Sequence, residues 1–272
     1  MRKVSSLLII SALLATPWSG RSQSPVTQEL VDQSTVIFKG RVEKTDASNL
    51  KILPASSQTV LVRVDEVISV AKTMTNLKGT TVTVLLKEAG SLKEGTSATF
   101  FTTGWLYGEN VALKEVSHIT ADLNTQSLQE QVATLQARTR DQKLQSRIQA
   151  SALVISGKVV SARPLEAEAK RRSNSEHDPD WWTADVEVQS LLKGPASAAS
   201  RVTLLFAHSK DVMWSRSPKL TEGQQGIWIA NEYKPGGLFP LERAPLLAVV
   251  SPLDYQPPAE RDRVQRLLKA SR

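Results

Sequence analysis

Three histidines, His118, His177 and His208, are the residues of this sequence that most readily bind metals or move protons. No two of them have the spacing of a shared metal site. His118 is expected at the surface near a strand end, and His208 in a loop after a strand. His177 lies in the acidic run 176–180, which could supply oxygen and imidazole ligands to a cation. The other interpretation is a solvated loop, because residues 166–180 are rich in charged and small polar residues.

Motifs of known catalytic centres do not occur in the sequence. There is no Gly-x-Ser-x-Gly elbow, phosphate-binding loop, His-Glu-x-x-His zinc motif or dinucleotide fingerprint. The chain contains no cysteine, which excludes thiol nucleophiles and cysteine-bound zinc. We therefore predict a protein that is not an enzyme, with no catalytic residue, metal or cofactor. The alternative is an exported hydrolase or metal-dependent enzyme that uses the 176–185 region, since carboxylate pairs can meet in space without any sequence motif.

Aromatic residues beside loops are better candidates for ligand binding. The four candidates are Trp181, Trp214, Tyr107 and Trp105. Alternation along the strand places Trp182 on the core face and Trp181 on the outer face, where we expect it to be exposed. An exposed tryptophan can stack on a sugar or anchor a partner protein. The other interpretation is that these rings pack beneath neighbouring loops.

Residues 1–22 have the composition of a secretory signal peptide. Met1-Arg2-Lys3 is basic, Leu7 to Ala15 is apolar, and small residues follow up to Ser22. The apolar run is shorter than the roughly 20 residues that span a bilayer, and no later segment is apolar enough. We therefore expect export to the periplasm or the outside, with no membrane span in the mature chain.

The net charge of +7 overstates how basic the exported chain is. The predicted leader holds three basic residues and no acid, so +7 less 3 leaves +4. Together with export, this modest charge counts against nucleic acid as a partner and leaves a protein or a cell-envelope polymer. Without cysteine, the exported chain must be held by its core alone, for which its length is ample.

Several short segments alternate apolar and polar residues, as half-buried strands do. The clearest are Val60 to Ile68 and Trp182 to Gly194. Residues 125–150 instead have apolar side chains every three to four positions, which predicts one or two helices that Asn124 or Thr125 can cap. Residues 258–270 are predicted to form a closing helix.

The second half of the chain repeats the first. The strand glycines Gly40 and Gly157 are 117 positions apart, the Leu-Lys-Gly turns at Gly79 and Gly194 are 115 apart, and the Glu-Gly turns at 95 and 223 are 128 apart. Segments 201–206 and 227–229 also match 81–86 and 99–101. Five matches in the same order indicate an internal duplication.

The segments VIFKGRV, VLVRVDEVI, LKG, TVTVLL, LKEG and ATFFT resemble the netrin-like domain, the OB-type barrel shared with tissue inhibitors of metalloproteinases, and LVISGKV to LTEGQQGIWIA resembles a second copy. The resemblance implies a mainly β fold of two tandem OB-like (netrin-like) five-stranded Greek-key barrels, each followed by a helix. Those inhibitors bind the protease zinc through an N-terminal cysteine and carry disulfides. This chain has neither, so their mode of inhibition is not implied.

The expected organisation is a signal peptide at 1–22, an OB-like domain at 23–123, a helical linker at 124–150 and a second OB-like domain with its C-terminal helix at 151–272. The function that agrees best with these features is an exported, non-enzymatic binding protein whose partner is a protein or a cell-envelope polymer.

Overall fold

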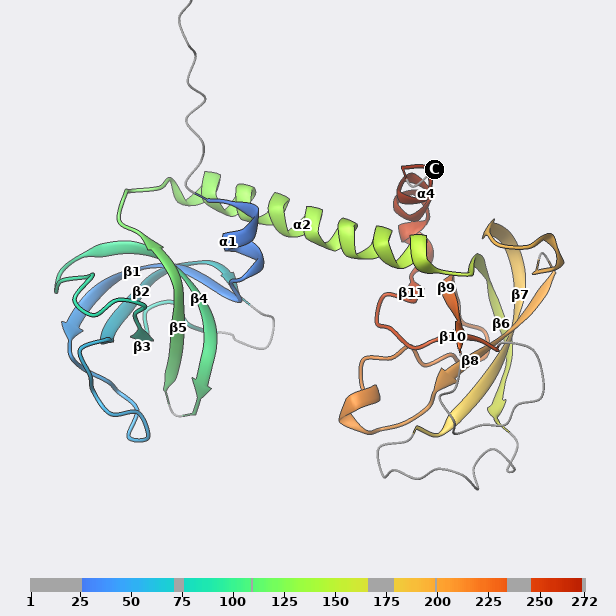
Figure 1. Cartoon of the computed structure of the whole chain (residues 1–272), viewed down its shortest axis with the longest axis horizontal. Coiled ribbons are helices and arrows are strands. Elements are labelled where there is room, and N and C mark those ends of the chain that lie inside the picture. The colour runs from blue at the N-terminus through green and yellow to red at the C-terminus, as the bar shows by residue number, and fades with distance from the viewer. Residues whose placement is uncertain are drawn as a thin grey trace, which may run out of the picture. The chain divides into compact units, whose positions relative to one another are not determined.

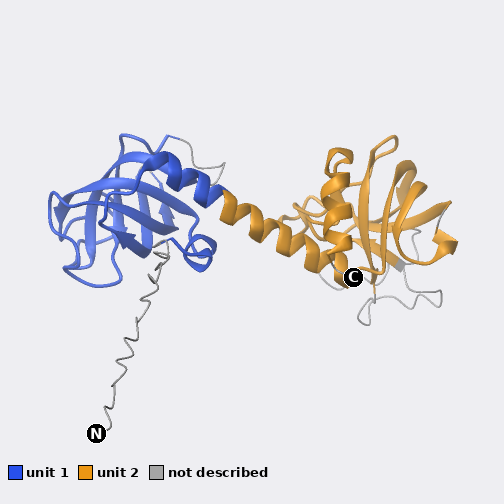
Figure 2. Cartoon of the chain, turned by 90° about the horizontal axis from the view of Figure 1, so that it is seen from above, with its two compact units in different colours: residues 1–133 blue, residues 134–272 orange. Residues whose placement is uncertain are grey.

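A computed structural model describes residues 26–70, 76–108, 110–165, 179–198, 200–233 and 246–270. The chain divides into two compact units, unit 1 at 1–133 and unit 2 at 134–272 (Figure 2). The predicted signal peptide at 1–22 lies outside the described residues. Among the helices of the described segments, none has the length and apolar character needed to cross a bilayer.

Unit 1 contains a closed five-stranded barrel (Figure 1). Its strands follow the order β1-β2-β3-β5-β4, and only β3 and β5 run parallel. This is the Greek-key arrangement of an OB-like barrel, so the predicted fold class is confirmed for this unit. The elements are α1 (Gln28–Asp32), β1 (Val36–Thr45), β2 (Thr59–Val70), β3 (Thr81–Leu85), β4 (Ser97–Tyr107), β5 (Val111–Ile119) and the start of α2 (Thr125–Ala150).

Unit 2 contains a second closed barrel. β10 pairs in parallel with β8 and antiparallel with β9, which closes the order β9-β6-β7-β8-β10. The short strand β11 adds to the other side of β9. The elements are β6 (Leu153–Pro164), β7 (Trp181–Lys193), η1 (Ala196–Ala198), β8 (Arg201–Ala207), η2 (Val212–Trp214), β9 (Gln225–Tyr233), β10 (Leu246–Val249), β11 (Tyr255–Gln256), η3 (Pro258–Glu260) and α4 (Arg261–Lys269).

The two barrels share their backbone irregularities as well as their strand order. In the β1–β2 pair, the register shifts after Ile37, Lys39 and Val42; in the β6–β7 pair it shifts at the positions 117 residues later, after 154, 156 and 159. The Glu-Gly turns also match, because Gly95 N donates to Val42 O and Gly223 N donates to Val159 O. Bulges alter strand twist and are specific features of a fold. Their recurrence supports the duplication independently of sequence similarity.

One of the sequence matches is wrong. Lys193 lies opposite Val154 in the β6–β7 ladder, and the residue in the same place of unit 1 is Ser69, opposite Ile37. The Leu-Lys-Gly turns at Gly79 and Gly194 are therefore not equivalent. Strand β2 ends at Val70, well before Gly79, whereas β7 ends at Lys193, directly before Gly194. A three-residue motif does not show how a strand is aligned with its partner.

The cores of the barrels use different side chains at one matched position. In unit 1, Phe38 lies opposite Phe100, and the rings stack with centroids 5.1 Å apart. In unit 2, the same position pairs Ile155 with Trp228. All four side chains are fully buried. Each barrel thus fills a comparable space with a different combination of shapes.

Helix α2 is one continuous helix that supplies buried side chains to each unit. Asn124 caps its N-terminus through a 3.0 Å hydrogen bond from Ser127 N, as predicted for one of the two capping candidates. Leu128 lies buried in unit 1. Leu144 and Ile148 pack in unit 2 in a cluster that includes a residue of α4. Helix α2 therefore contributes buried apolar side chains in both units.

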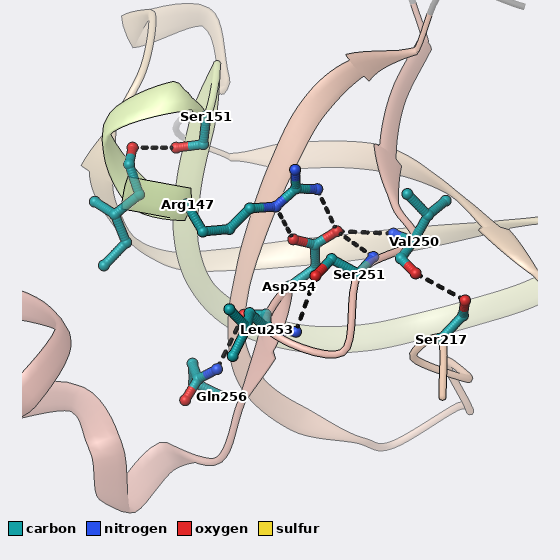
Figure 3. Close-up of polar contacts among 9 residues, drawn as sticks. Arg147, Ser151, Ser217, Val250, Ser251, Leu253, Asp254 and Gln256 are labelled. Atoms are coloured by element: carbon teal, nitrogen blue, oxygen red, sulfur yellow. Dashed lines mark hydrogen bonds and ion pairs between the residues drawn. The ribbon is translucent and has the colours of Figure 1, made fainter. Parts of the chain in front are cut away.

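In unit 2, a buried ion pair fixes the C-terminal end of α2 (Figure 3). The guanidinium of Arg147 donates to both oxygens of Asp254, at 2.5 and 2.8 Å. Asp254 is fully buried and also accepts from Val250 N and Ser251 N, each at 2.8 Å. With its amide oriented to satisfy both neighbours, Asn231 accepts from Arg147 Nη2 and donates to the carbonyl of residue 150. Four hydrogen bonds thus offset the desolvation of one carboxylate.

Lys193, at the end of β7, caps the same helix. Its ammonium donates to the carbonyl oxygens of Ile148, Gln149 and Ser151 at 2.9, 2.8 and 2.6 Å. The last carbonyls of a helix have no partner within it and carry partial negative charge, so a cation placed there stabilises the helix end.

Candidate functional site

The β4–β5 hairpin of unit 1 carries two of the predicted binding residues. Trp105 is 38% exposed and Tyr107 is 59% exposed, which is high for rings of this size. Both belong to the end of β4 and are two positions apart. The Tyr107 ring lies over Gly104, where a Cβ would come within 1.6 Å of the phenol oxygen. These two exposed aromatic residues therefore lie on one hairpin.

The adjoining strand face, which OB folds often use for ligands, is covered by the chain's own loop. Asn49, in the loop between β1 and β2, donates to Thr81 O at 2.8 Å and accepts from the Thr83 hydroxyl at 2.7 Å. Thr83 is fully buried beneath it. Asn110, in the β4–β5 turn, donates to Asn49 O at 2.8 Å and joins the two loops. The outer face of β3 is therefore closed by this loop.

The expected exposure of Trp181 is wrong. Trp181 does lie on the outer face of its strand, but only 7% of its surface is exposed. Trp214, from the 3₁₀ turn η2, packs edge-on against it with centroids 5.6 Å apart, and the Tyr233 ring lies 5.0 Å away. The interpretation in which the ring packs beneath a loop is the correct one, and the covering loop comes from beyond β8.

Trp182 occupies the core face, as alternation predicts, and packs against the buried cluster of unit 2. It is half-buried, and its outer edge is stacked on His208, with centroids 4.2 Å apart. His208 follows β8 in a loop, as expected. Trp105 and Tyr107 belong to unit 1, whereas Trp181 and Trp214 belong to unit 2.

The histidines give no metal cluster within the described residues. His118 is less exposed than expected, because its Nδ1 lies 2.7 Å from Oε1 of the buried Glu115, whose other oxygen accepts from Lys87 N at 2.8 Å. His177 and its neighbours 176 and 178 lie outside the described residues. Across the described segments, no group of three or more His, Cys, Asp or Glu side chains is arranged to hold a metal ion.

Asp185, in the 176–185 region, is a carboxyl group of unit 2 with a strongly lowered pKa. It accepts from the Thr203 hydroxyl at 2.7 Å, from Arg163 Nη1 at 2.8 Å and from the Ser161 hydroxyl at 3.0 Å. The hydrogen bond from Thr203, followed by that from Arg163, lowers the pKa of Asp185 from 3.8 to about 2. A carboxylate held in its ionised form by three donors ties β6, β7 and β8 together and is a poor general acid.

Asp185→Asn is expected to lower the free energy of unfolding at neutral pH by about 1–2 kcal/mol. The reason is that the interactions that lower the pKa of Asp185 from 3.8 to about 2 stabilise the folded state, and an amide cannot form them as a carboxylate does. The folded pKa lies below the unfolded one, so the stabilisation is complete above about pH 4 and is lost as the pH falls through about 2. Urea unfolding across this pH range measures the difference. Glu187→Gln, on the same strand, is the control. Variant and wild-type curves that stay parallel down to pH 2 would contradict this role of the carboxylate.

Two polar hollows adjoin one another on the outer face of β1 and β2. One, of about 400 Å³, is lined by Lys39, Glu66, Thr125 and neighbouring residues, and the other, of about 630 Å³, by Arg41, Arg63 and four further residues. Asp65 lines both. Sequence reasoning missed this surface, because it treated the outward-facing charges of these strands as ordinary solvated residues.

Comparison with models of known protein families finds no match, and a search among curated proteins finds no relative. The structure itself gives two candidate surfaces in unit 1. One is the exposed aromatic pair of the β4–β5 hairpin, and the other is the pair of charged hollows on the outer face of β1 and β2.

Proposed function

We propose that this chain is an exported, non-enzymatic binding protein that contacts a protein or polymer of the cell envelope through unit 1. The exposed pair Trp105 and Tyr107 carries the proposal. Rigid, amphipathic rings at the edge of a β barrel provide contact area at low entropic cost, and such residues dominate binding energy at interfaces. The leader-like residues 1–22 support export.

The hairpin is held in place, which favours binding without a folding cost. Asn110 ties the β4–β5 turn to the β1–β2 loop through Asn49, and Asn49 is anchored on β3. A preorganised surface loses less conformational entropy when a ligand binds. The OB-like topology of both barrels also supports the finer proposal that each copy is a netrin-like domain.

Simultaneous replacement of Trp105 and Tyr107 by alanine is expected to weaken retention of the envelope ligand about tenfold or more, because two anchoring rings are lost. The measurement is affinity capture from an envelope extract on the immobilised mature chain. The control is the double variant Val212→Ser with Met213→Ser in unit 2. It removes exposed apolar surface from a different place, because Val212 is 82% exposed and Met213 is 67% exposed. Equal retention by the aromatic variant and the control would refute the role of the hairpin.

The same preparation should be assayed against a panel of hydrolase substrates. We expect no turnover. A wild-type chain that captures nothing from the extract and turns over a substrate would refute the proposed function in favour of the hydrolase or metal-dependent alternative. In that event, the loss of activity in His177→Ala would identify the 176–185 region as the site.

A further inference from the structure

Two arginines lie side by side on the outer face of unit 1. Arg41 on β1 and Arg63 on β2 are direct partners in the antiparallel ladder. Both side chains are exposed, and both line the hollow of about 630 Å³. Like charges directly opposite one another on two strands are destabilising, so this pair has a cost that the fold alone does not require.

Neither arginine forms an ion pair with another described residue. Glu43 and Asp65 line the same hollow, but no ion pair within 4 Å joins either of them to Arg41 or Arg63 among the described residues. Glu43 instead accepts a hydrogen bond from the Thr81 hydroxyl at 2.9 Å. The two guanidinium groups therefore keep their donors available to a ligand. Lys39, nearby, differs because its ammonium is held by Asp122 and by the carbonyl of residue 123.

The second barrel provides an internal comparison. The shared bulges make Lys158 the counterpart of Arg41 and Glu187 the counterpart of Arg63, and these two residues are likewise direct partners in the β6–β7 ladder. Unit 2 thus places opposite charges where unit 1 places two positive charges. Since the backbone is the same at both places, the fold tolerates a compensated pair, and the arginine pair is particular to unit 1.

We propose that Arg41 and Arg63 form a binding site for the phosphate or carboxylate groups of an anionic envelope polysaccharide. Guanidinium groups bind both kinds of oxyanion through paired, charge-assisted hydrogen bonds. This inference rests on the proposed function and specifies its ligand. It places the bound anion on the outer face of strands β1 and β2. The outer face of β3 is not available, because the loop between β1 and β2 covers it.

The lining of the hollows favours a polysaccharide over a protein. An interface with a protein usually has an apolar or aromatic anchor at its centre. Here Val42 is the only apolar side chain among those lining the larger hollow, and it is 1% exposed. The adjoining hollow, joined through Asp65, adds the hydroxyl residues Ser97 and Thr120, which suit the hydroxyl groups of sugars. It also carries the carboxylates Glu66 and Asp122, so it suits neutral sugar units and not the acidic groups. The acidic group of the polymer is therefore assigned to the larger hollow, beside Arg41 and Arg63, and a neutral sugar unit to the smaller one.

The test measures binding of the mature chain to phosphorylated dextran and to polygalacturonate, with neutral dextran and polyglutamate for comparison. We expect binding to one or both of the anionic polysaccharides, and we expect added salt to weaken this binding. Arg63→Glu, which reproduces the charge pair of unit 2, and Arg41→Gln should each lower affinity about tenfold or more, because a charge-assisted bidentate contact is lost. The preference between the phosphate and the carboxylate polymer identifies the acidic group.

Lys158→Gln is the matched control, because it removes one positive charge from the equivalent position of unit 2. Its affinity should remain within about twofold of wild type, whereas an equal loss in Lys158→Gln and Arg41→Gln would overturn the site in favour of general charge attraction. Binding to polyglutamate alone would overturn the polysaccharide assignment. Absence of binding by the wild type to every anionic probe would overturn the inference entirely. If envelope material is still captured in that case, the proposed function stands and only this site fails. A melting temperature of Arg63→Glu at or above that of wild type shows that the variant folds.

Discussion

Asp254→Ala is expected to lower the free energy of unfolding of unit 2 by about 3–5 kcal/mol. The substitution removes a fully buried acceptor of four hydrogen bonds. It leaves the Arg147 guanidinium and two part-buried backbone N–H groups without their acceptor, and only 25% of the Arg147 side chain is exposed. Such orphaned groups bear the full desolvation cost. The same change removes the ion pair that joins the C-terminal end of α2 to the β10–β11 connection (Figure 3).

Urea denaturation followed by tryptophan fluorescence measures this loss, because four of the five tryptophans in the described segments belong to unit 2. Hydrogen exchange then shows whether protection is lost in unit 2 alone. The control is Asp141→Ala, which breaks the ion pair between Asp141 and Arg263. The Asp141 side chain is 44% exposed, so this substitution should lower the free energy of unfolding by less than about 1 kcal/mol. Similar losses in Asp254→Ala and Asp141→Ala would mean that burial contributes nothing to the value of the Arg147 pair.

Gly157→Ala is expected to destabilise unit 2 by about 2–3 kcal/mol. A Cβ at this position would lie 2.2 Å from Glu187 O and 3.0 Å from a methyl group of Val186, so the strands must separate. Gly40→Ala should do the same in unit 1, where the Cβ would lie 2.5 Å from Arg63 O. In each barrel the first two strands approach too closely for any side chain other than hydrogen.

Thermal and urea unfolding of the two variants, with hydrogen exchange to assign each loss to its unit, measure this effect. Gly108→Ala is the control, because a Cβ there meets nothing within 4 Å and the backbone is not left-handed. It should be close to neutral. A variant of Gly40 or Gly157 as stable as Gly108→Ala would show that the two strands can separate at little cost.

Local patterns predicted most of the scaffold. Alternation identified the long strands around Val62 and Val186, and side-chain spacing identified α2, because each pattern arises from one buried face of one element. The failed Leu-Lys-Gly match shows the limit of short motifs. Register depends on bulges, and the three bulges in each first strand pair have no signal in the sequence.

The candidate site was less predictable, because it depends on contacts between distant segments. Alternation gave the correct direction for Trp181, but its burial depends on Trp214 and Tyr233, which come from later parts of the chain. Arg41 and Arg63 become neighbours only once the register is known. Asp254 follows a Ser-Pro turn with no sign that its partner lies 107 positions earlier.

The different core pairs at the matched position have a consequence for folding fidelity. A chain with two copies of one topology can exchange equivalent strands between copies as it folds. A barrel that took β1 in place of β6 would place Phe38 against Trp228, and its counterpart would place Ile155 against Phe100. The first is overfilled and the second leaves a void, each of which costs stability. Divergence of side-chain volume on a shared backbone thus gives each strand a preference for its own copy.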